Sequence, residues 1–306
     1  MNKKVVSVLS VLVIIVFIGY MVYDSVRPQD SLKEIQGTAL LEAIPDSWKV
    51  SGELKTVEGP LNAVAAGKDG LVFLGGDSFV NCYDTDLKLQ WSVKTPYAVT
   101  ALAIHGDTLV ASSVEQLMIM NLSGKIEDEW GPFEEKSIIT SVAINNKYIA
   151  FSDAGNKIVF ILDRKGAVSS MMGQNGGEFV LPSPYFDLAV DSDNTLFIAN
   201  TGHRRIETRN TEGKLLGFFG EPGIAPEAFC GCCNPSHFVL IPGGIITAEK
   251  GINRIKILSR SGEFKEYVSA DNNFVASVPL DIASADGETI YAANPADSKL
   301  YVFKRK

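Results

Sequence analysis

Residues 184–220 constrain the fold more than any other stretch, because four strand-like runs follow one another there at short, regular spacing. The runs FDLAV, TLFIA, RIETR and LLGFF are rich in apolar, β-branched or aromatic residues. They are separated by DSDN, NTGH and NTEGK, which are clusters of turn-forming residues. The stretch therefore predicts one complete antiparallel meander of four β-strands.

Five weaker copies of this meander align on one apolar position in each predicted first strand. The six anchor positions are Val64, Leu102, Val142, Leu188, Val239 and Ile282. They are 38, 40, 46, 51 and 43 residues apart, close to the roughly 40–50 residues of a propeller blade. The repeat predicts an all-β, six-bladed β-propeller over residues 47–306, and copies that stay in phase disfavour an irregular β-sandwich.

The last copy has only three strands, because the chain stops at Lys306. Residues 48–57 lie upstream of the first copy, are strand-like and belong to no other blade. We expect them to supply the missing fourth strand. This pairing would close the ring and remove two open strand edges.

The segment from Pro184 to Ile206 resembles the NHL repeat, a family of six-bladed β-propellers. The matching positions are Pro184, Ala189, Val190, Asp191, Ala199, Thr201, Gly202, Arg205 and Ile206. Asn200, His203 and Arg204 depart from the family pattern, and the other copies match it less well. The resemblance implies a scaffold, and since propellers host many functions it implies no particular activity.

Residues 1–23 predict a single-pass transmembrane signal anchor. The run from Val5 to Tyr23 has no charge, and its helix would span roughly 28 Å, close to a bilayer's hydrocarbon core. Lys3 and Lys4 precede the run and predict a cytoplasmic N-terminus. The alternative is a cleaved signal peptide, which the length of the run and the bulky residues after it disfavour.

The remainder of the chain is then predicted to lie outside the cytoplasm, in a periplasm or at a cell surface. Residues 24–46 are mixed and polar and predict a linker. The net charge is −8 with no long basic run, so the propeller lacks the electrostatic footprint of a nucleic-acid-binding protein. The sequence also has no GxxxxGK[ST], HExxH or GxSxG motif.

One face of the predicted propeller gathers polar residues. In a propeller, the connections from fourth to first strands and the turns from second to third strands emerge together around the mouth of the central channel; we call this the channel-mouth face. The predicted ligand-binding residues there are Asp153, Asn200, His203, Arg204, Glu249, Lys250 and Arg254. Such a face predicts a site for a protein partner or a small ligand, and the alternative for each residue is a solvated turn.

The motif Cys230-Gly231-Cys232-Cys233-Asn234-Pro235 lies in the longest interval between anchors. Three interpretations stay open. Two of the cysteines could form a short structural disulfide in an oxidising compartment. The three could bind a metal ion or an iron–sulfur cluster, with His203 or His237 as a further ligand. A cysteine could instead do redox or nucleophilic chemistry with His203 as base.

Taken together, the sequence predicts a membrane-anchored, extracytoplasmic propeller that acts as a binding or scaffold module, as an accessory of a membrane complex. The alternative is a metal- or redox-active propeller that uses the cysteines. A third hypothesis is a lactonase- or lyase-like enzyme centred on the channel. Only three histidines exist, too few for the histidine ring of zinc lyases that resemble this fold, whereas Glu249, Asp153 and Asn200 could face the channel as in calcium-dependent lactonase-like propellers.

Overall fold

The computed structural model describes residues 12–19, 47–231, 233–270, 274–276 and 278–306. Residues 12–19 are helical. Among the described residues we find no helix with the length and apolarity of a membrane span.

The predicted anchor, residues 1–23, lies outside the described residues except for its helical portion, and the predicted linker, residues 24–46, lies outside them entirely. The chain divides into two compact units, residues 1–43 and residues 44–306. The second unit carries all the strands described below.

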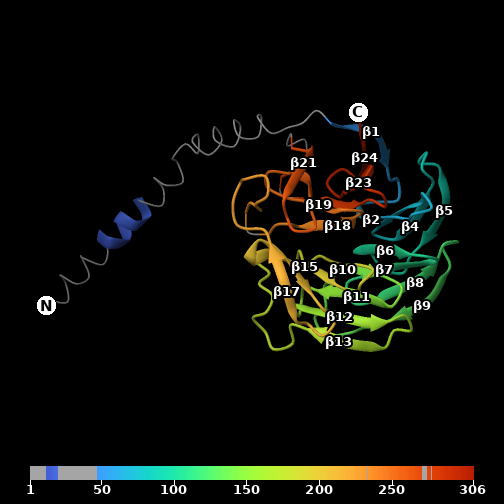
Figure 1. Ribbon diagram of the computed structural model, residues 1–306, viewed down its shortest axis with the longest axis horizontal. Helices are drawn as coiled ribbons and strands as arrows, with labels where there is room; N and C mark the ends of the chain where they lie inside the picture. The colour runs from blue at the N-terminus through green and yellow to red at the C-terminus, as the bar shows by residue number, and fades with distance from the viewer. Residues whose placement is uncertain (1–11, 20–46, 232, 271–273, 277) are drawn as a thin grey trace. The chain divides into compact units, whose positions relative to one another are not determined.

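The second unit is an all-β, six-bladed propeller, as predicted, and each blade is a four-stranded antiparallel sheet. Figure 1 shows the sheets arranged around a common centre. The first, innermost strands of the blades are β2 (Leu61–Ala66), β6 (Ala101–His105), β10 (Ile139–Ile144), β14 (Leu188–Val190), β18 (His237–Ile241) and β22 (Asp281–Ala283). The second strands are β3 (Val72–Gly76), β7 (Thr108–Ser112), β11 (Tyr148–Asp153), β15 (Leu196–Asn200), β19 (Gly244–Ala248) and β23 (Thr289–Asn294).

The outer half of each blade follows the same order. The third strands are β4 (Phe79–Tyr83), β8 (Leu117–Asn121), β12 (Ile158–Asp163), β16 (Arg205–Arg209), β20 (Ile255–Leu258) and β24 (Lys299–Arg305). The fourth strands are β5 (Leu89–Lys94), β9 (Ile126–Trp130), β13 (Val168–Met172), β17 (Leu215–Phe219), β21 (Phe264–Ser269) and, from the start of the propeller, β1 (Trp48–Lys55). One 3₁₀ helix, η1 (Thr201–His203), joins β15 to β16.

The core lies between blades. Buried apolar side chains form clusters that each draw on two neighbouring blades, for example Phe197 and Ile206 of the fourth blade with Phe238 and Ile245 of the fifth. Because both faces of a blade are covered, the second strands are buried along almost their whole length. This explains why their sequences read as continuous apolar runs without alternation.

The ring closes as predicted, through pairing of the two ends of the propeller. β1 pairs antiparallel with β24, from Trp48 opposite Arg305 to Lys55 opposite Lys299. Figure 1 shows the blue strand β1 beside the red strand β24. Trp48 is buried in the core between the fifth and sixth blades, so the closing strand contributes side-chain packing as well as backbone hydrogen bonds.

Candidate functional site

The inner strands enclose a cavity of about 520 Å³ that runs through the centre of the propeller. All six repeat anchors line it, namely Val64, Leu102, Val142, Leu188, Val239 and Ile282. Most of its wall is therefore apolar. At the channel-mouth end, three titratable residues on adjacent blades interrupt this wall: Asp187, His237 and Asp281.

These three side chains form one cluster. Asp187 directly precedes β14, His237 begins β18 and Asp281 begins β22, so all three stand at the channel-mouth end of their strands. Nδ1 of His237 lies 3.4 Å from Oδ1 of Asp281 and 3.8 Å from Oδ2 of Asp187. A single imidazole nitrogen thus faces two carboxylates.

Asp187 links three blades through its carboxylate. Its Oδ2 accepts a hydrogen bond from the backbone N–H of Phe238 at 2.6 Å, across to the fifth blade. Its Oδ1 accepts the backbone N–H of Leu188 at 2.9 Å and the hydroxyl of Ser141, from the third blade. Burial raises the pKa of Asp187, and the opposing effects of His237 and these hydrogen bonds do not cancel it.

Asp281 links the sixth blade to the first in the same way. Its Oδ2 accepts the backbone N–H of Val64 at 2.8 Å, and its Oδ1 accepts that of Ile282 at 2.9 Å. Burial raises the pKa of this carboxyl to about 6, although His237 acts in the opposite direction. The channel wall therefore carries two desolvated carboxylates that hold their protons more strongly than exposed ones.

The predicted ligand-binding residues of the channel-mouth face lie elsewhere, and several are buried within the protein. Glu249 and Arg254 are fully buried and paired at 2.9 Å, and Lys256 lies 3.0 Å from the same carboxylate. Arg254 and Lys256 also donate to the carbonyl of Ala228, at 2.9 and 2.6 Å. This network attaches the inserted loop before β18 to the fifth blade.

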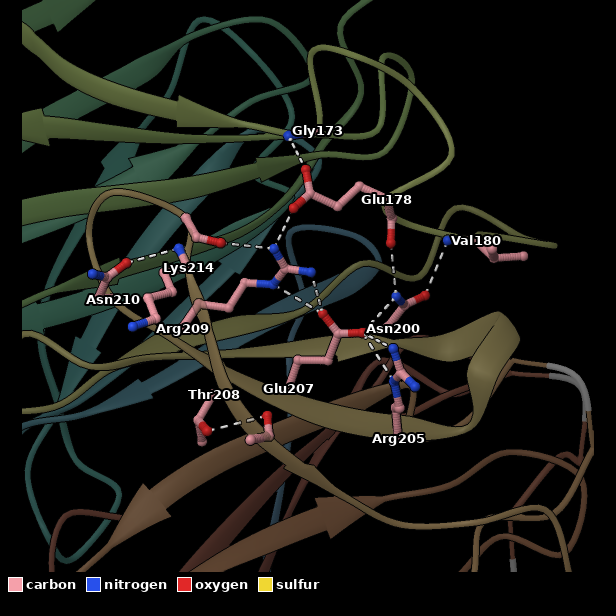
Figure 2. A network of polar contacts seen from close by, with 12 residues as sticks. Gly173, Glu178, Val180, Asn200, Arg205, Glu207, Thr208, Arg209, Asn210 and Lys214 are labelled. Atoms are coloured by element: carbon pink, nitrogen blue, oxygen red, sulfur yellow. Dashed lines mark hydrogen bonds and ion pairs between the residues drawn. The ribbon is translucent and has the colours of Figure 1, made fainter.

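Asn200 belongs to a second buried network, drawn in Figure 2. It donates to Glu207 at 2.9 Å and accepts the backbone N–H of Val180 at 3.0 Å. Glu207 is fully buried and also paired with Arg209 at 2.7 Å, and Arg209 in turn binds Glu178. Burial opposes ionisation of Glu207, but the hydrogen bonds from Arg205, Arg209 and Asn200 together lower its pKa.

Asp153 is likewise buried, and its carboxylate accepts backbone hydrogen bonds from Ile138 at 2.8 Å and Gly155 at 2.9 Å. Asp153, Asn200 and Glu249 are absent from the cavity wall. The structure thereby corrects the expectation that these three residues face the channel. Their side chains hold the connections between blades, because a long loop can pack only if its backbone groups find partners.

The remaining predicted residues of this face are closer to its surface. His203 is exposed in η1. Arg204 donates a hydrogen bond to the carbonyl of Gly231 in the cysteine motif. The ammonium of Lys250 lies 4.5 Å from the ring centre of Tyr185. Ligand binding by these residues stays a prediction.

The cysteine motif is only partly described, because Cys232 lies outside the described residues. Cys230 is a free thiol whose pKa is raised by burial and by Glu249, which disfavours the thiolate needed for metal binding or nucleophilic attack. Sγ of Cys233 lies 2.6 Å from Oγ of Ser183. Among the described residues, no group of three or more His, Cys, Asp or Glu side chains has an arrangement that could hold a metal ion. The metal interpretation stays a prediction.

The channel-mouth face also carries exposed apolar side chains. Each of the six connections between blades presents one, and the turn between β7 and β8 adds another: Val57, Tyr97, Val114, Ile138, Val180, Ile224 and Val275, with exposed fractions of 39 to 91%. In the described chain, the turns of the opposite face present no exposed large apolar residue. Among the described turns and connections, exposed large apolar side chains therefore occur on the channel-mouth face and not on the opposite face.

Exposed acidic residues accompany these apolar side chains around the first three blades. The connections and turns of the channel-mouth face there carry Glu58, Asp77, Glu115, Glu134 and Glu135, all exposed, and two exposed lysines, Lys136 and Lys157. In the connections and turns of this sector, exposed acidic side chains outnumber exposed basic ones, so the sector is negative.

A scan of protein-family models and a search of curated proteins each give no match. Among solved structures, the chain is similar to virginiamycin B lyase from Staphylococcus aureus, with 16% identity, 84% of this chain and 99% of that chain covered, and a TM-score of 0.58. It is similar to a protein of unknown function from Bacteroides thetaiotaomicron (12% identity, 87% and 74% covered, TM-score 0.61). It is also similar to the WD40 domain of Pan2 from Neurospora crassa (10% identity, 86% and 97% covered, TM-score 0.57).

These neighbours include an enzyme and a WD40 domain. At such identities the likeness shows the β-propeller fold alone, and propellers carry unrelated functions. Membership of the NHL family stays a prediction.

Proposed function

We propose that this protein is a binding module that docks a protein partner on its channel-mouth face. The observation that carries the proposal is the unequal distribution of exposed apolar side chains between the two faces. Exposed apolar groups gathered on one face and mixed with polar residues are typical of protein interaction sites.

The apolar side chains are presented on a fixed backbone, which favours recognition. The backbone carbonyls of Val114, Ile138 and Val180 accept hydrogen bonds of 2.8 to 2.9 Å from neighbouring turns. Each loop is thereby held to the next blade while its side chain points to solvent. Such preorganisation reduces the entropy lost on binding.

The charge of the face indicates the chemistry of the partner. The negative sector around the first three blades complements a surface that carries Lys and Arg next to apolar groups. The same charge disfavours an anionic membrane surface as the occupant, because acidic side chains and anionic headgroups repel each other.

The first test is photo-crosslinking in cells that make the protein naturally. A crosslinking residue replaces Tyr97 or Ile224 on the channel-mouth face, or the equally exposed Leu89 or Val168 on the fourth strands. We expect one discrete protein adduct from the first pair only. Glu134→Lys combined with Glu135→Lys should weaken adduct formation about tenfold or more, because two negative charges that attract a basic partner become positive charges that repel it.

Several results would contradict this proposal. Adducts from Leu89 and Val168 as strong as those from Tyr97 would mean that contact is unspecific. Adducts to lipid, or to a second copy of this chain, would assign the face to a membrane or to self-association. Unchanged adduct formation after the charge reversal would remove the argument for a basic partner.

We further propose that the module is anchored in a membrane and works outside the cytoplasm as an accessory of a membrane complex. The uncharged run from Val5 to Tyr23 and the preceding lysines support this. Protease added to intact spheroplasts should then degrade the propeller while cytoplasmic proteins survive. A shortened chain in the soluble extracytoplasmic fraction would show instead that the run is a cleaved signal peptide.

A further inference from the structure

The cluster of Asp187, His237 and Asp281 lines the channel at its channel-mouth end, and none of the exposed side chains that support the docking proposal belongs to it. Both carboxylates are held in place by backbone hydrogen bonds from neighbouring blades, so their positions are set by the ring itself. Such a rigid pair at a cavity wall is suited to binding.

Apart from the backbone N–H groups and the hydroxyl of Ser141 described above, the cluster has one donor, the imidazole of His237. Nδ1 of His237 can donate one N–H, but it faces one oxygen of Asp281 and one of Asp187. The two contacts, at 3.4 and 3.8 Å, are longer than good hydrogen bonds between charged groups. At least one carboxylate oxygen is thus left with acceptor capacity that no described side chain fills.

When both carboxyls are ionised, the cluster also has an excess of negative charge. Two ionised carboxylates face at most one positive charge on His237. Lys68, Asp69, His105 and Asp107 also line the cavity, but they lie in or directly before turns between first and second strands, at the opposite end of the channel. No described lysine or arginine approaches within 4.0 Å of either carboxylate of the cluster.

We propose that the carboxylates of Asp187 and Asp281 form a binding site in the channel for an organic cation with N–H donors, a primary ammonium or a guanidinium group. His237 lies beside these carboxylates and is not itself a ligand. Such a cation supplies both the missing donors and the missing charge. The cavity of about 520 Å³ accommodates a small molecule of this class, and the apolar wall formed by the repeat anchors suits its alkyl portion.

Titration of the full chain with butylammonium chloride, followed by NMR, tests the site. The backbone amides of Val64 and Phe238 report on it, because each donates to one of the two carboxylates. We expect saturable shifts of these signals at pH 7.5 and none with n-butanol, which has the same length and no charge. Affinity should fall as the pH is lowered through about 6, where Asp281 takes up a proton and no longer attracts a cation.

Variants separate the site from the rest of the channel. Asp281→Asn should weaken binding about 10- to 100-fold, as expected for the loss of a charged hydrogen-bond acceptor. Asp107→Asn removes a carboxylate at the opposite end and should leave affinity unchanged. His237→Gln keeps both carboxylates and should retain binding, which provides a test should Asp281→Asn fail to fold.

The titrations also decide between two sources of the cation, and some of their outcomes would overturn the proposed cation site. Tighter binding of Nα-acetyl-lysine amide than of butylammonium would assign the site to a lysine side chain of a partner, and the reverse order to a free amine. Equal shifts with n-butanol, equal loss in Asp107→Asn, abolished binding in His237→Gln, or saturation by calcium chloride but not by butylammonium would each overturn the proposal. The outcomes that overturn the proposal concern the channel alone, and photo-crosslinking tests docking at the channel-mouth face separately.

Discussion

Glu249→Gln is expected to destabilise the propeller by about 3–5 kcal/mol, the usual effect of removing one partner from a buried ion pair. The carboxylate of Glu249 is fully buried and balances two cations, Arg254 at 2.9 Å and Lys256 at 3.0 Å. Glutamine keeps the shape but leaves both cations in the interior without a counter-charge. Chemical denaturation at pH 7, compared with the wild type, measures the change in the free energy of unfolding.

Lys256→Met is the matched control, because it leaves Glu249 and Arg254 as a balanced pair. Burial lowers the pKa of Lys256 to about 8, against the opposing effect of Glu249. Below the lowered pKa, the lysine must be buried in its charged form, and this opposes folding. Between a pH of about 8 and the pKa of about 10.4 that lysine has in the unfolded chain, the unfolded chain binds more protons than the folded one, so stability rises with pH.

Lys256→Met should therefore cost little at pH 7 and should remove up to about 3 kcal/mol of the rise in stability above pH 8. If the free energy of unfolding of the Glu249→Gln variant instead lies within about 1 kcal/mol of the wild-type value, water reaches the network and screens the buried charges. If both substitutions are equally damaging, side-chain packing is responsible and charge balance is not.

The fold was predictable because a propeller repeats one simple pattern. Each blade needs an apolar residue in its first strand, and the anchors Val64 and Ile282 mark the first and last copies even where the rest of the repeat is weak. All six anchors lie on the inner strands and line the channel. The missing fourth strand was also predictable. One unassigned strand precedes the first blade and the last copy has three strands, so pairing these two ends gives six blades of four strands.

The roles of the polar turn residues were harder to predict. Asp153, Asn200 and Glu249 stand at or just after the ends of their second strands, where a side chain can point either to a ligand or to the adjoining connection. Sequence shows that such a residue is polar, but it does not show which backbone groups lie within reach. The structure places all three against connections between blades.

The channel cluster was missed for a related reason. The cysteine motif predicts His237 only as a further metal ligand beside the cysteines, and no sequence motif includes Asp187 or Asp281. Yet both aspartates directly precede an anchor, Leu188 or Ile282, at a repeat position where the first two blades have Ala63 and Ala101. A charged residue at a position that is uncharged in the other four blades is costly to bury and therefore indicates a specific role.

A chain that begins at residue 60, and so lacks β1, should lose most of the stability of the propeller. The loss removes the ladder between β1 and β24, in which each hydrogen bond contributes about 1 kcal/mol net. It also removes Trp48 from the core between the fifth and sixth blades, and burying a large apolar side chain contributes roughly 1.5–3 kcal/mol. These losses are comparable with the roughly 5–15 kcal/mol by which a typical domain is stable.

Aggregation should accompany this destabilisation, because β24 becomes an open edge. Its sequence KLYVFKR has four consecutive apolar or aromatic residues between basic ones, and an unpaired edge of this kind offers backbone hydrogen bonds to other chains. A chain that begins at residue 46 keeps β1 and is the control, measured by thermal denaturation and light scattering. Equal melting temperatures for the two chains would mean that the ring does not depend on its closing strand, because the other blades would then hold the sixth blade without it.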